Sequence, residues 1–205
     1  MQQRSDQASQ PGTGGRANQR LRTRTAILRA ASELMRDGRD VTMPEVARAA
    51  LVSEATAYRY FPNLASLLRE AMAGQWPTPA EALARVADVT DPVERVAAAA
   101  EHLARTVLVN QGAARAMIAA TVTRPEDVPA RPALRLGLID HALAPVADTL
   151  DAAALEQLKR SLSVVISAEA VFTLTDLLRL DAQEAVAGVV RAATALTREA
   201  LRPTS

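Results

Sequence analysis

The spacing of the apolar residues is the feature that most restricts how this chain can fold. In the first apolar segment these residues recur at intervals of three and four, which places them on one face of a helix: Leu21, Ile27, Leu28, Ala31, Leu34 and Met35. The same spacing returns along the rest of the chain, alanine is frequent, and strings of β-branched residues are scarce. The sequence therefore predicts an all-α protein of about nine helices.

The residue types that are missing exclude several classes of chemistry. The 205 residues include no cysteine and only two histidines. A disulfide framework, a thiol nucleophile and a cysteine zinc site are therefore excluded. His102 and His141 each follow an acidic residue, but adjacent residues on a helix diverge by about 100° and do not converge on one ion. We expect no metal, no cofactor and no enzymatic activity, since no nucleophile and base are brought together.

No segment of the sequence predicts contact with a membrane. The chain contains no uncharged apolar run of about 18 residues, and its amino terminus lacks the apolar core of a signal peptide. We therefore expect a cytoplasmic protein.

Positive charge is gathered at the amino-terminal end. Residues 1–74 hold eleven arginines against seven acidic residues, a net charge of +4, whereas the remainder holds thirteen cations against sixteen acids, a net charge of −3. Residues 1–19 are mainly Gln, Ser, Gly and Pro, and we expect them to form a disordered basic arm. Such an arm suits a polyanionic partner. A solvated tail that serves only solubility is the alternative.

Capping signals divide residues 20–74 into short helices. A first helix from Arg20 ends at Gly38, and Thr42-Met43-Pro44-Glu45 has the Thr-x-x-Glu form of a capping box that begins a second. Ser53 is a suitable N-cap for a third helix through Tyr60, which Phe61-Pro62 ends, and Asn63 can cap a fourth. Two short helices joined by a tight turn after a basic arm are typical of a helix-turn-helix domain.

The segment from Arg20 to Ala73 resembles the DNA-binding domain of the TetR family of transcriptional regulators. The residues that carry the resemblance are Val52-Ser53, Thr56, Tyr58, Tyr60, Phe61-Pro62 and Leu67-Leu68. The resemblance implies a helix-turn-helix three-helix domain over residues 20–74, with double-stranded DNA as its partner. Residues 53–60 would be the recognition helix that lies in the major groove.

The resemblance also implies which residues contact DNA. Arg20, Arg22 and Arg24 would reach phosphate or the narrow minor groove without holding any core, and the Thr42 hydroxyl would hold a phosphate at the start of the preceding helix. The tyrosine hydroxyls would bind phosphate; alternatively, one of the two rings packs in the core. The expected contacts beyond the arm are Thr42, Met43, Ser53, Glu54, Ala55, Thr56, Tyr58, Arg59 and Tyr60.

Three residues depart from the pattern of the family. Leu51 stands where the family usually has a turn glycine, so the turn either avoids positive φ or carries a strain of about 1 kcal/mol. Glu54 occupies a position that is often basic: it would accept a hydrogen bond from a cytosine amino group, or it is only an acid stabilised by the helix dipole. Leu64 replaces a common lysine, so we expect one phosphate contact fewer.

Residues 75–205 are predicted to form a helical bundle that binds a ligand and dimerises. We expect a short helix within 80–88, helices over 91–109 and 113–123, a helix over 132–150 bent near Pro145, a long helix over 151–180, and a last helix opened by Asp181. The last helix carries one apolar face and the long helix before it carries two, so the long helix needs a second partner, most simply the same helix of another subunit. The resemblance implies the same contact, a four-helix bundle built from the last two helices of each subunit. A well-packed monomer core is the alternative. The expected interface residues are Leu158, Leu162, Val165, Val186, Val189 and Val190.

A ligand cavity is expected among the helices between residues 91 and 180. The candidates for its lining are His102, Arg105, Met117, Thr121, His141, Glu169, Phe172 and Thr173. The sequence thus predicts a ligand-responsive transcriptional regulator, a repressor, that binds a palindromic operator as a homodimer and is released by a small apolar or amphipathic effector. The alternative is a helical protein that binds small molecules or other proteins and has no DNA-binding activity.

Overall fold

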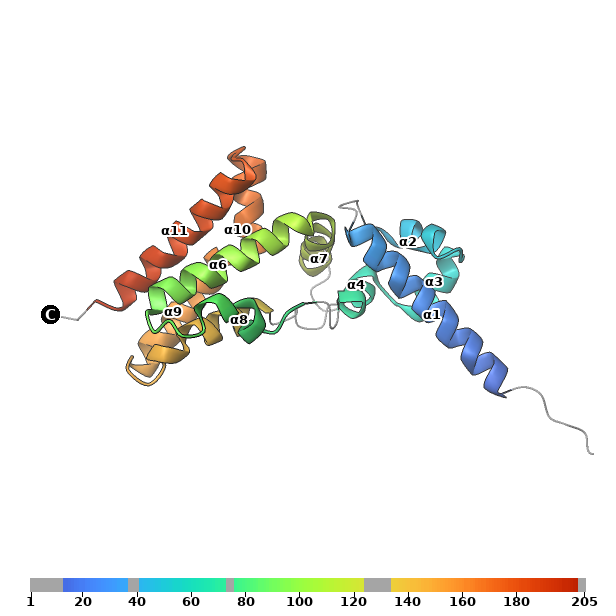
Figure 1. The fold of residues 1–205 in the computed structure, drawn as a ribbon. Coiled ribbons are helices and arrows are strands. Elements are labelled where there is room, and N and C mark those ends of the chain that lie inside the picture. The colour runs from blue at the N-terminus through green and yellow to red at the C-terminus, as the bar shows by residue number, and fades with distance from the viewer. Residues whose placement is uncertain (1–12, 37–40, 73–75, 124–133, 203–205) are drawn as a thin grey trace, which may run out of the picture.

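The computed structural model describes residues 13–36, 41–72, 76–123 and 134–202, and these residues are helical with no strand. Figure 1 shows α1–α4 in one group and α6 and α8–α11 in another, with α7 at the junction of the two groups. The all-α fold expected from the apolar spacing is confirmed, with eleven α-helices rather than about nine in the described residues. Within those residues, no helix has the length and apolar character that crossing a membrane requires.

The amino-terminal domain packs three short helices against one long one. It consists of α1 (Thr13–Arg36), α2 (Met43–Ala49), α3 (Glu54–Tyr60) and α4 (Leu64–Met72), and α1 contacts both α2 and α4. Its core contains Ile27, Phe61, Leu67 and Leu68, each 2% exposed or less. The predicted caps are present, since the Ser53 hydroxyl and the Asn63 side chain each accept a backbone N–H of the following turn.

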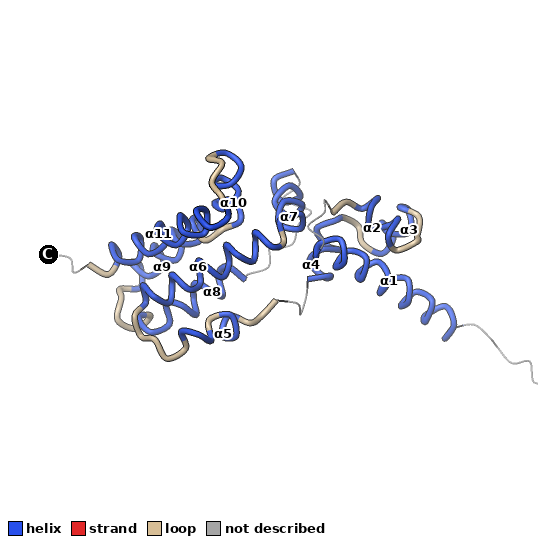
Figure 2. Tube along the Cα trace, turned by 45° about the horizontal axis from the view of Figure 1, so that its top comes forward, coloured by secondary structure: helices blue, strands red, loops and turns tan. Residues whose placement is uncertain are grey.

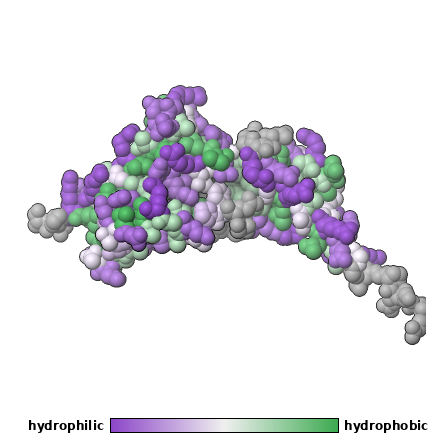
Figure 3. Space-filling view, in the orientation of Figure 1, coloured by the Kyte–Doolittle hydropathy of each residue, from purple (hydrophilic) through white to green (hydrophobic). Residues whose placement is uncertain are grey.

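Helix α1 begins earlier than the sequence predicted. Residues 13–19, expected to belong to a disordered arm, form the first two turns of α1, while residues 1–12 lie outside the described residues. Ala, Arg and Gln favour helix, and adding residues to an existing helix costs far less than starting one. The residues from Gly15 to Arg20 are all exposed. Figure 3 shows mostly hydrophilic residues along this projecting part of α1.

The carboxy-terminal domain is built around α6 (Pro92–Val109), which packs along α11 (Ala182–Ala200) and α8 (Leu134–Leu143). Both predicted starts are present: Asp91 caps α6, and Asp181 and Glu184 form a reciprocal capping box on α11. Within 80–88 the chain forms α5 (Pro79–Ala82) and a 3₁₀ turn (Ala84–Val86), and a second 3₁₀ turn (Ala144–Val146) follows α8 at Pro145. Figure 2 shows α8 and α9 beside α6 and α11.

The long helix expected over 151–180 is interrupted, which corrects the sequence prediction. Helix α9 (Ala152–Val165) ends before Ile166, and Ser167 begins α10 (Ala168–Phe172), which continues as a π-helical turn (Thr173–Leu177). Val164, Val165 and Ile166 are β-branched and weaken the helix, whereas the Ser167 hydroxyl accepts the N–H of Ala170 at 3.1 Å as an N-cap. Helical periodicity does not reveal such a break, because the apolar spacing continues across it.

One buried arginine holds the carboxy-terminal domain together. Arg95 is 5% exposed, and its guanidinium donates to the carbonyls of Val86, Ala87 and Val89 and to those of His141 and Ala142. These carbonyls lie at the end of the first 3₁₀ turn and at the end of α8. One side chain from α6 therefore donates to the free carbonyls at the ends of two helical segments. The sequence analysis did not identify this residue.

Helix α7 (Gln111–Thr123) belongs to both domains. Ala113 is fully buried in the core of the amino-terminal domain, and Met117 packs against that core. One residue further on, Ile118 packs against the core of the carboxy-terminal domain. Helix α7 therefore contacts the apolar cores of both domains.

Candidate functional site

The amino-terminal part of α3 is exposed on the surface of the helix-turn-helix domain. Ser53, Glu54, Ala55 and Arg59 are exposed, whereas Ala57, on the opposite side of the helix, is fully buried. The Ser53 hydroxyl accepts from the N–H of Thr56 and donates to the Thr56 hydroxyl at 2.9 Å, which orders the first turn. Helix α3 thus presents one side to solvent and is anchored by the other. Both interpretations of Glu54 stay open.

The turn between α2 and α3 carries the strain that the missing glycine implied. Leu51 has φ of 56°, in the left-handed region, and its side chain is 92% exposed. The N–H of Val52 donates to the carbonyl of Ala47 and that of Leu51 to the carbonyl of Arg48, which is the Schellman pattern that ends a helix. The turn therefore keeps the geometry that glycine would provide, at a cost of about 1 kcal/mol.

The two tyrosines of α3 divide between the two expected roles. Tyr58 is 48% exposed, whereas Tyr60 is half-buried against the core of the domain. The Arg59 guanidinium lies over the Tyr60 ring, 5.7 Å from its centroid. Tyr60 is thus the ring that packs in the core, and Tyr58 is the tyrosine placed to reach a partner.

The start of α2 differs from the expectation. Met43, expected to contact DNA, is 3% exposed and belongs to the core, so that assignment is wrong. Proline at the next position suits the first turn of α2, and an apolar side chain such as that of Met43 is most stable when buried. The Thr42 hydroxyl accepts the N–H of Glu45 and donates to the Glu45 carboxylate at 3.0 Å, so the capping box is closed on one side only.

The arginines of α1 also divide. Arg20 and Arg22 are exposed. Arg24 instead forms a two-bond ion pair with Glu70 of α4, with 2.6 Å between Nη2 and Oε2, and its guanidinium lies 5.0 Å from the centre of the Phe61 ring. The expectation that Arg24 holds no core is therefore wrong. The pair joins α1 to α4 because the two helices cross at this point.

Three hollows meet near the junction of the two domains, and Trp76 and Asn110 line all of them. The first is a cavity of about 160 Å³ in the carboxy-terminal domain. The second, of about 110 Å³, lies against α1 and α4, and the third, of about 340 Å³, is open along the outer side of α6. The cavity is walled by Met72, Leu103, Thr106, Val107, Ala114, Met117, Ile118, Leu134, Arg135, Ser167, Ala168 and Glu169 in addition to the two shared residues.

The ligand-contact candidates fall in different places. Met117 and Glu169 line the cavity, and His102 and Arg105 line the open hollow. The side chain of Thr121 lies outside the described residues. Three further candidates lie outside the walls of these hollows: His141, Phe172 and Thr173.

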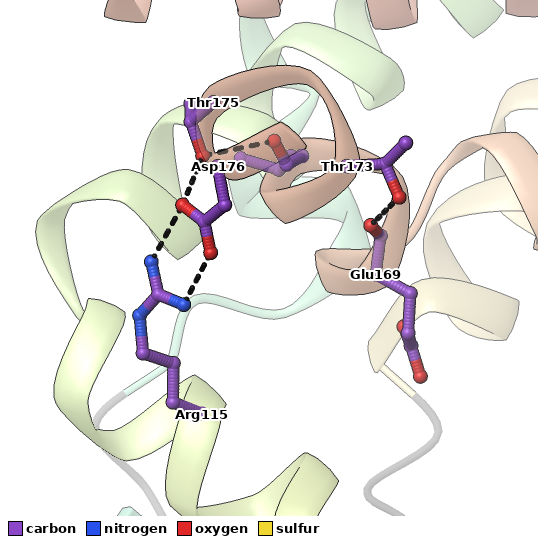
Figure 4. Close-up of polar contacts among 6 residues, drawn as sticks. Arg115, Glu169, Thr173, Thr175 and Asp176 are labelled. Atoms are coloured by element: carbon purple, nitrogen blue, oxygen red, sulfur yellow. Dashed lines mark hydrogen bonds and ion pairs between the residues drawn. The ribbon is translucent and has the colours of Figure 1, made fainter. Parts of the chain in front are cut away.

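The reason those three lie elsewhere is visible in their contacts. The Thr173 hydroxyl donates back to the carbonyl of Glu169 at 2.9 Å (Figure 4). The Arg115 guanidinium lies over the Phe172 ring, 4.0 Å from its centroid. The carbonyl of His141 accepts from the buried Arg95. Helical spacing alone could not show which side of α8 or α10 these residues occupy.

An ion pair connects α7 to the π-helical turn. Arg115 donates to both oxygens of Asp176, at 2.6 and 3.0 Å, and the Thr175 hydroxyl donates to the same carboxylate (Figure 4). These hydrogen bonds, chiefly those from Arg115, lower the pKa of Asp176 to about 2. The pair fixes the turn that follows α10 against the helix shared by the two domains.

Most of the residues predicted to form the dimer interface are buried within the chain itself. Leu158, Leu162, Val186 and Val189 are at most 6% exposed and belong to the chain's own core. Val165 and Val190 are half-buried. The apolar side chains that do face outward near these helices are Val164, Leu177 and Leu178, each more than 60% exposed. The spacing of apolar residues does not distinguish the stripe that packs on the chain's own core from one that faces outward, because both have helical spacing. Only the packing shows which stripe the fold covers.

Several cavity residues escaped the sequence analysis. Thr106 and Asn110 follow His102 at intervals of four along α6 and its C-cap, so these three polar residues lie in one row on the helix. That row, and the position of Trp76 directly after the domain break, were signals that could have identified this region. Arg135 and Leu134 carried no comparable signal, because they follow a segment without helical pattern.

Comparisons with known proteins bear on the amino-terminal domain. Residues 27–71 match the family model described as bacterial regulatory proteins, tetR family. No curated protein matches the chain. A solved structure, the crystal structure of a TetR transcriptional regulator from Rhodococcus sp. RHA1, is 23% identical with a TM-score of 0.46, over 87% of this chain and 97% of that one. The family match covers the helix-turn-helix domain and shows that residues 27–71 form a DNA-binding domain of the kind found in the tetR family of bacterial regulatory proteins.

Proposed function

We propose that the chain is a ligand-responsive repressor that binds a palindromic DNA operator as a homodimer and leaves it when a small apolar or amphipathic effector binds. The observation that carries the proposal is the exposed side of α3, formed by Ser53, Ala55, Tyr58 and Arg59 around the buried anchor Ala57. A helix held in this way can enter the major groove, which is about 12 Å wide. Arg20 and Arg22 project from α1 and supply cations for phosphate.

A homodimer follows from the small number of bases that one such helix can read. Two recognition helices about 34 Å apart would enter successive major grooves. We place the subunit contact at the outward apolar residues Leu177 and Leu178 and at the half-buried row of α11, Gly188, Ala192 and Leu196. Leu174, which touches Gly188, joins the two groups.

Effector release would use α7. The cavity and the core of the amino-terminal domain share Met117, and Met72 of α4 also lines the cavity. A ligand that fits the cavity better in one arrangement of α7 and α4 than in the other would shift the separation of the recognition helices.

The DNA-binding part is tested with the DNA upstream of the chain's own gene, labelled for fluorescence anisotropy at physiological salt. Ala55→Asp places a carboxylate at the second position of α3, where the helix dipole tolerates it but phosphate repels it. Ala153→Asp is the matched control, because Ala153 is exposed at the second position of α9 after an aspartate cap. We expect binding to be lost only in the first variant. Equal affinity of the two variants would reject α3 as the recognition helix.

The dimer contact is tested by sedimentation equilibrium. Leu177→Glu, at a residue 75% exposed, should give a monomer with unchanged helix content, whereas Val122→Glu, at a residue 74% exposed on α7, should leave the dimer intact. A wild-type chain that is monomeric at micromolar concentration and still binds DNA selectively would refute the dimer.

A further inference from the structure

The chemistry of the hollows near Trp76 allows the class of effector to be narrowed, and this step rests on the function proposed above. The cavity is apolar over most of its wall, with Leu103, Ile118 and Leu134 among its lining residues. Such a wall takes a hydrocarbon portion of a ligand. The sign of charge that the ligand carries is decided by the polar groups at its two ends.

At the end lined by Arg135 and Glu169, opposite charges already balance among the described residues. Arg135 of α8 donates to the carbonyl of Ser163 at 3.0 Å, and its guanidinium lies 4.0 Å from the Glu169 carboxylate. An ionic group placed there would gain one neighbour and be repelled by the other. The Arg135–Glu169 end therefore suits the uncharged part of a ligand.

Near the end lined by Trp76 and Asn110, arginine side chains outnumber the carboxylate that they share. Arg85 and Arg105 both bond to the single carboxylate of Glu101, at 2.6 and 3.0 Å, so two guanidinium groups share one negative charge. Arg105 and His102 line the open hollow that begins where the cavity ends, and Trp76 and Asn110 line both. An anionic group at this end would be attracted by the surplus cation.

His102 provides an independent observation at the same place. Its Nε2 atom is buried and has no hydrogen-bond partner among the described residues. Burial, together with the nearby Arg85 cation, lowers the pKa of the imidazole, which is therefore neutral near pH 7. A buried polar atom without a partner is unusual, and a ligand oxygen that accepts a hydrogen bond from the Nε2–H group would satisfy it.

We propose that the cavity binds an amphipathic monoanion, with its hydrocarbon part among Leu103, Ile118 and Leu134 and its anionic head at the Trp76 end, held by Arg105 and His102. The anionic head lies away from the Arg135–Glu169 pair, and the hydrocarbon tail runs from Trp76 into the cavity. This arrangement assigns the two ends of one molecule to two chemically different regions of the structure.

The test uses Trp76, the only tryptophan in the chain, as its reporter. The full-length protein is titrated with octanoate, 1-octanol and octylamine, three probes of the same chain length and different charge, and tryptophan fluorescence is recorded. We expect octanoate to bind about fivefold more tightly than octanol, because an exposed charge pair contributes roughly this much, and octylamine to bind most weakly. Equal affinities, preference for the amine, or no response to octanoate would overturn the proposal.

Two variants assign the binding energy to residues. Arg105→Gln should remove the preference for octanoate and leave octanol binding unchanged, while Arg198→Gln, at an exposed position of α11, should change neither. Ala114→Leu fills the cavity from α7 and should abolish binding of both probes, with helix content checked by circular dichroism. An Arg105 variant that weakens both probes equally, or an Ala114 variant that weakens neither, would contradict the assigned arrangement.

Failure of the effector model is distinguished by adding octanoate to the protein–DNA complex. If octanoate binds with the expected preference but does not release DNA, the anion site stands and the release mechanism is wrong. If DNA is released by octanol and octanoate with equal potency, the release mechanism stands and the anion site is wrong.

Discussion

The two domains bury their apolar residues around different centres. In the amino-terminal domain the core is closed around Phe61, Ile27 and the Leu67-Leu68 pair, all essentially inaccessible to solvent. In the carboxy-terminal domain, a buried guanidinium and a cavity of about 160 Å³ lie within the bundle. The first arrangement fixes the position of an exposed helix, and the second leaves room for a ligand.

This difference indicates which domain can repack when a ligand binds. A closed core resists rearrangement because any shift creates voids, whereas helices around a cavity have two ways to pack, with and without an occupant. Helix α7 has Ala113 in the closed core and Ile118 at the cavity wall.

The largest effect is expected at Arg95, in the carboxy-terminal domain. Arg95→Met keeps much of the apolar stem but leaves the buried carbonyls near Val86 and at the end of α8 without donors. Unfolding in urea, followed by circular dichroism, should show a loss of about 3 kcal/mol. Arg198→Met, at an exposed position, is the control and should cost under about 0.5 kcal/mol. Equal costs would mean that the bundle does not depend on its buried cation.

The next effect separates binding from stability in α1. Arg20→Ala together with Arg22→Ala should lower DNA affinity about tenfold with no change in melting temperature, because both side chains are exposed. Arg24→Ala should instead cost about 1 kcal/mol of stability, since its pair with Glu70 and its contact with Phe61 are partly exposed. A loss of stability in the Arg20 and Arg22 variant, with none in the Arg24 variant, would contradict the prediction that only Arg24 stabilises the domain.

A stabilising change is expected at the turn between α2 and α3. Leu51→Gly should raise the free energy of unfolding by about 1 kcal/mol, because glycine adopts φ of 56° without strain and the exposed leucine side chain loses little packing. Thermal unfolding of the two proteins provides the measurement. Leu21→Gly, at an exposed position within α1, is the control and should destabilise. A less stable Leu51 variant would show that the side chain makes a contact that outweighs the strain.

The smallest effect concerns the pH dependence of the Arg115–Asp176 pair. Folding lowers the pKa of Asp176 from 3.8 to about 2, so the stabilisation is complete above the unfolded pKa and is lost as the pH falls from about 4 towards 2. A double-mutant cycle with Arg115→Gln and Asp176→Asn should show a favourable coupling at pH 6 that declines at pH 3. A coupling that is constant over this range would mean that the carboxylate charge is not involved.

The sequence by itself determined where helices begin, because helix caps depend on local chemistry. Ser53, Asn63, Asp91 and Asp181 each accept a backbone N–H within three residues, so a short segment suffices to predict a helix start. The helix-turn-helix arrangement followed from those starts. The positive φ of Leu51 was one of two alternatives, since the sequence shows a missing glycine but does not show how the turn responds.

Tertiary structure decided which face of each helix is covered. The spacing of Leu158, Leu162 and Val189 predicts an apolar stripe, but a stripe can pack on its own core or on a partner, and here it packs on its own core. Met43 and Arg24 likewise carry no local sign that one is buried and the other paired with Glu70, 46 residues away. Trp76 and Asn110 are brought together only when α6 packs beside the connection that follows α4. Local chemistry determines where helices begin, whereas long-range packing determines which side chains are left to function.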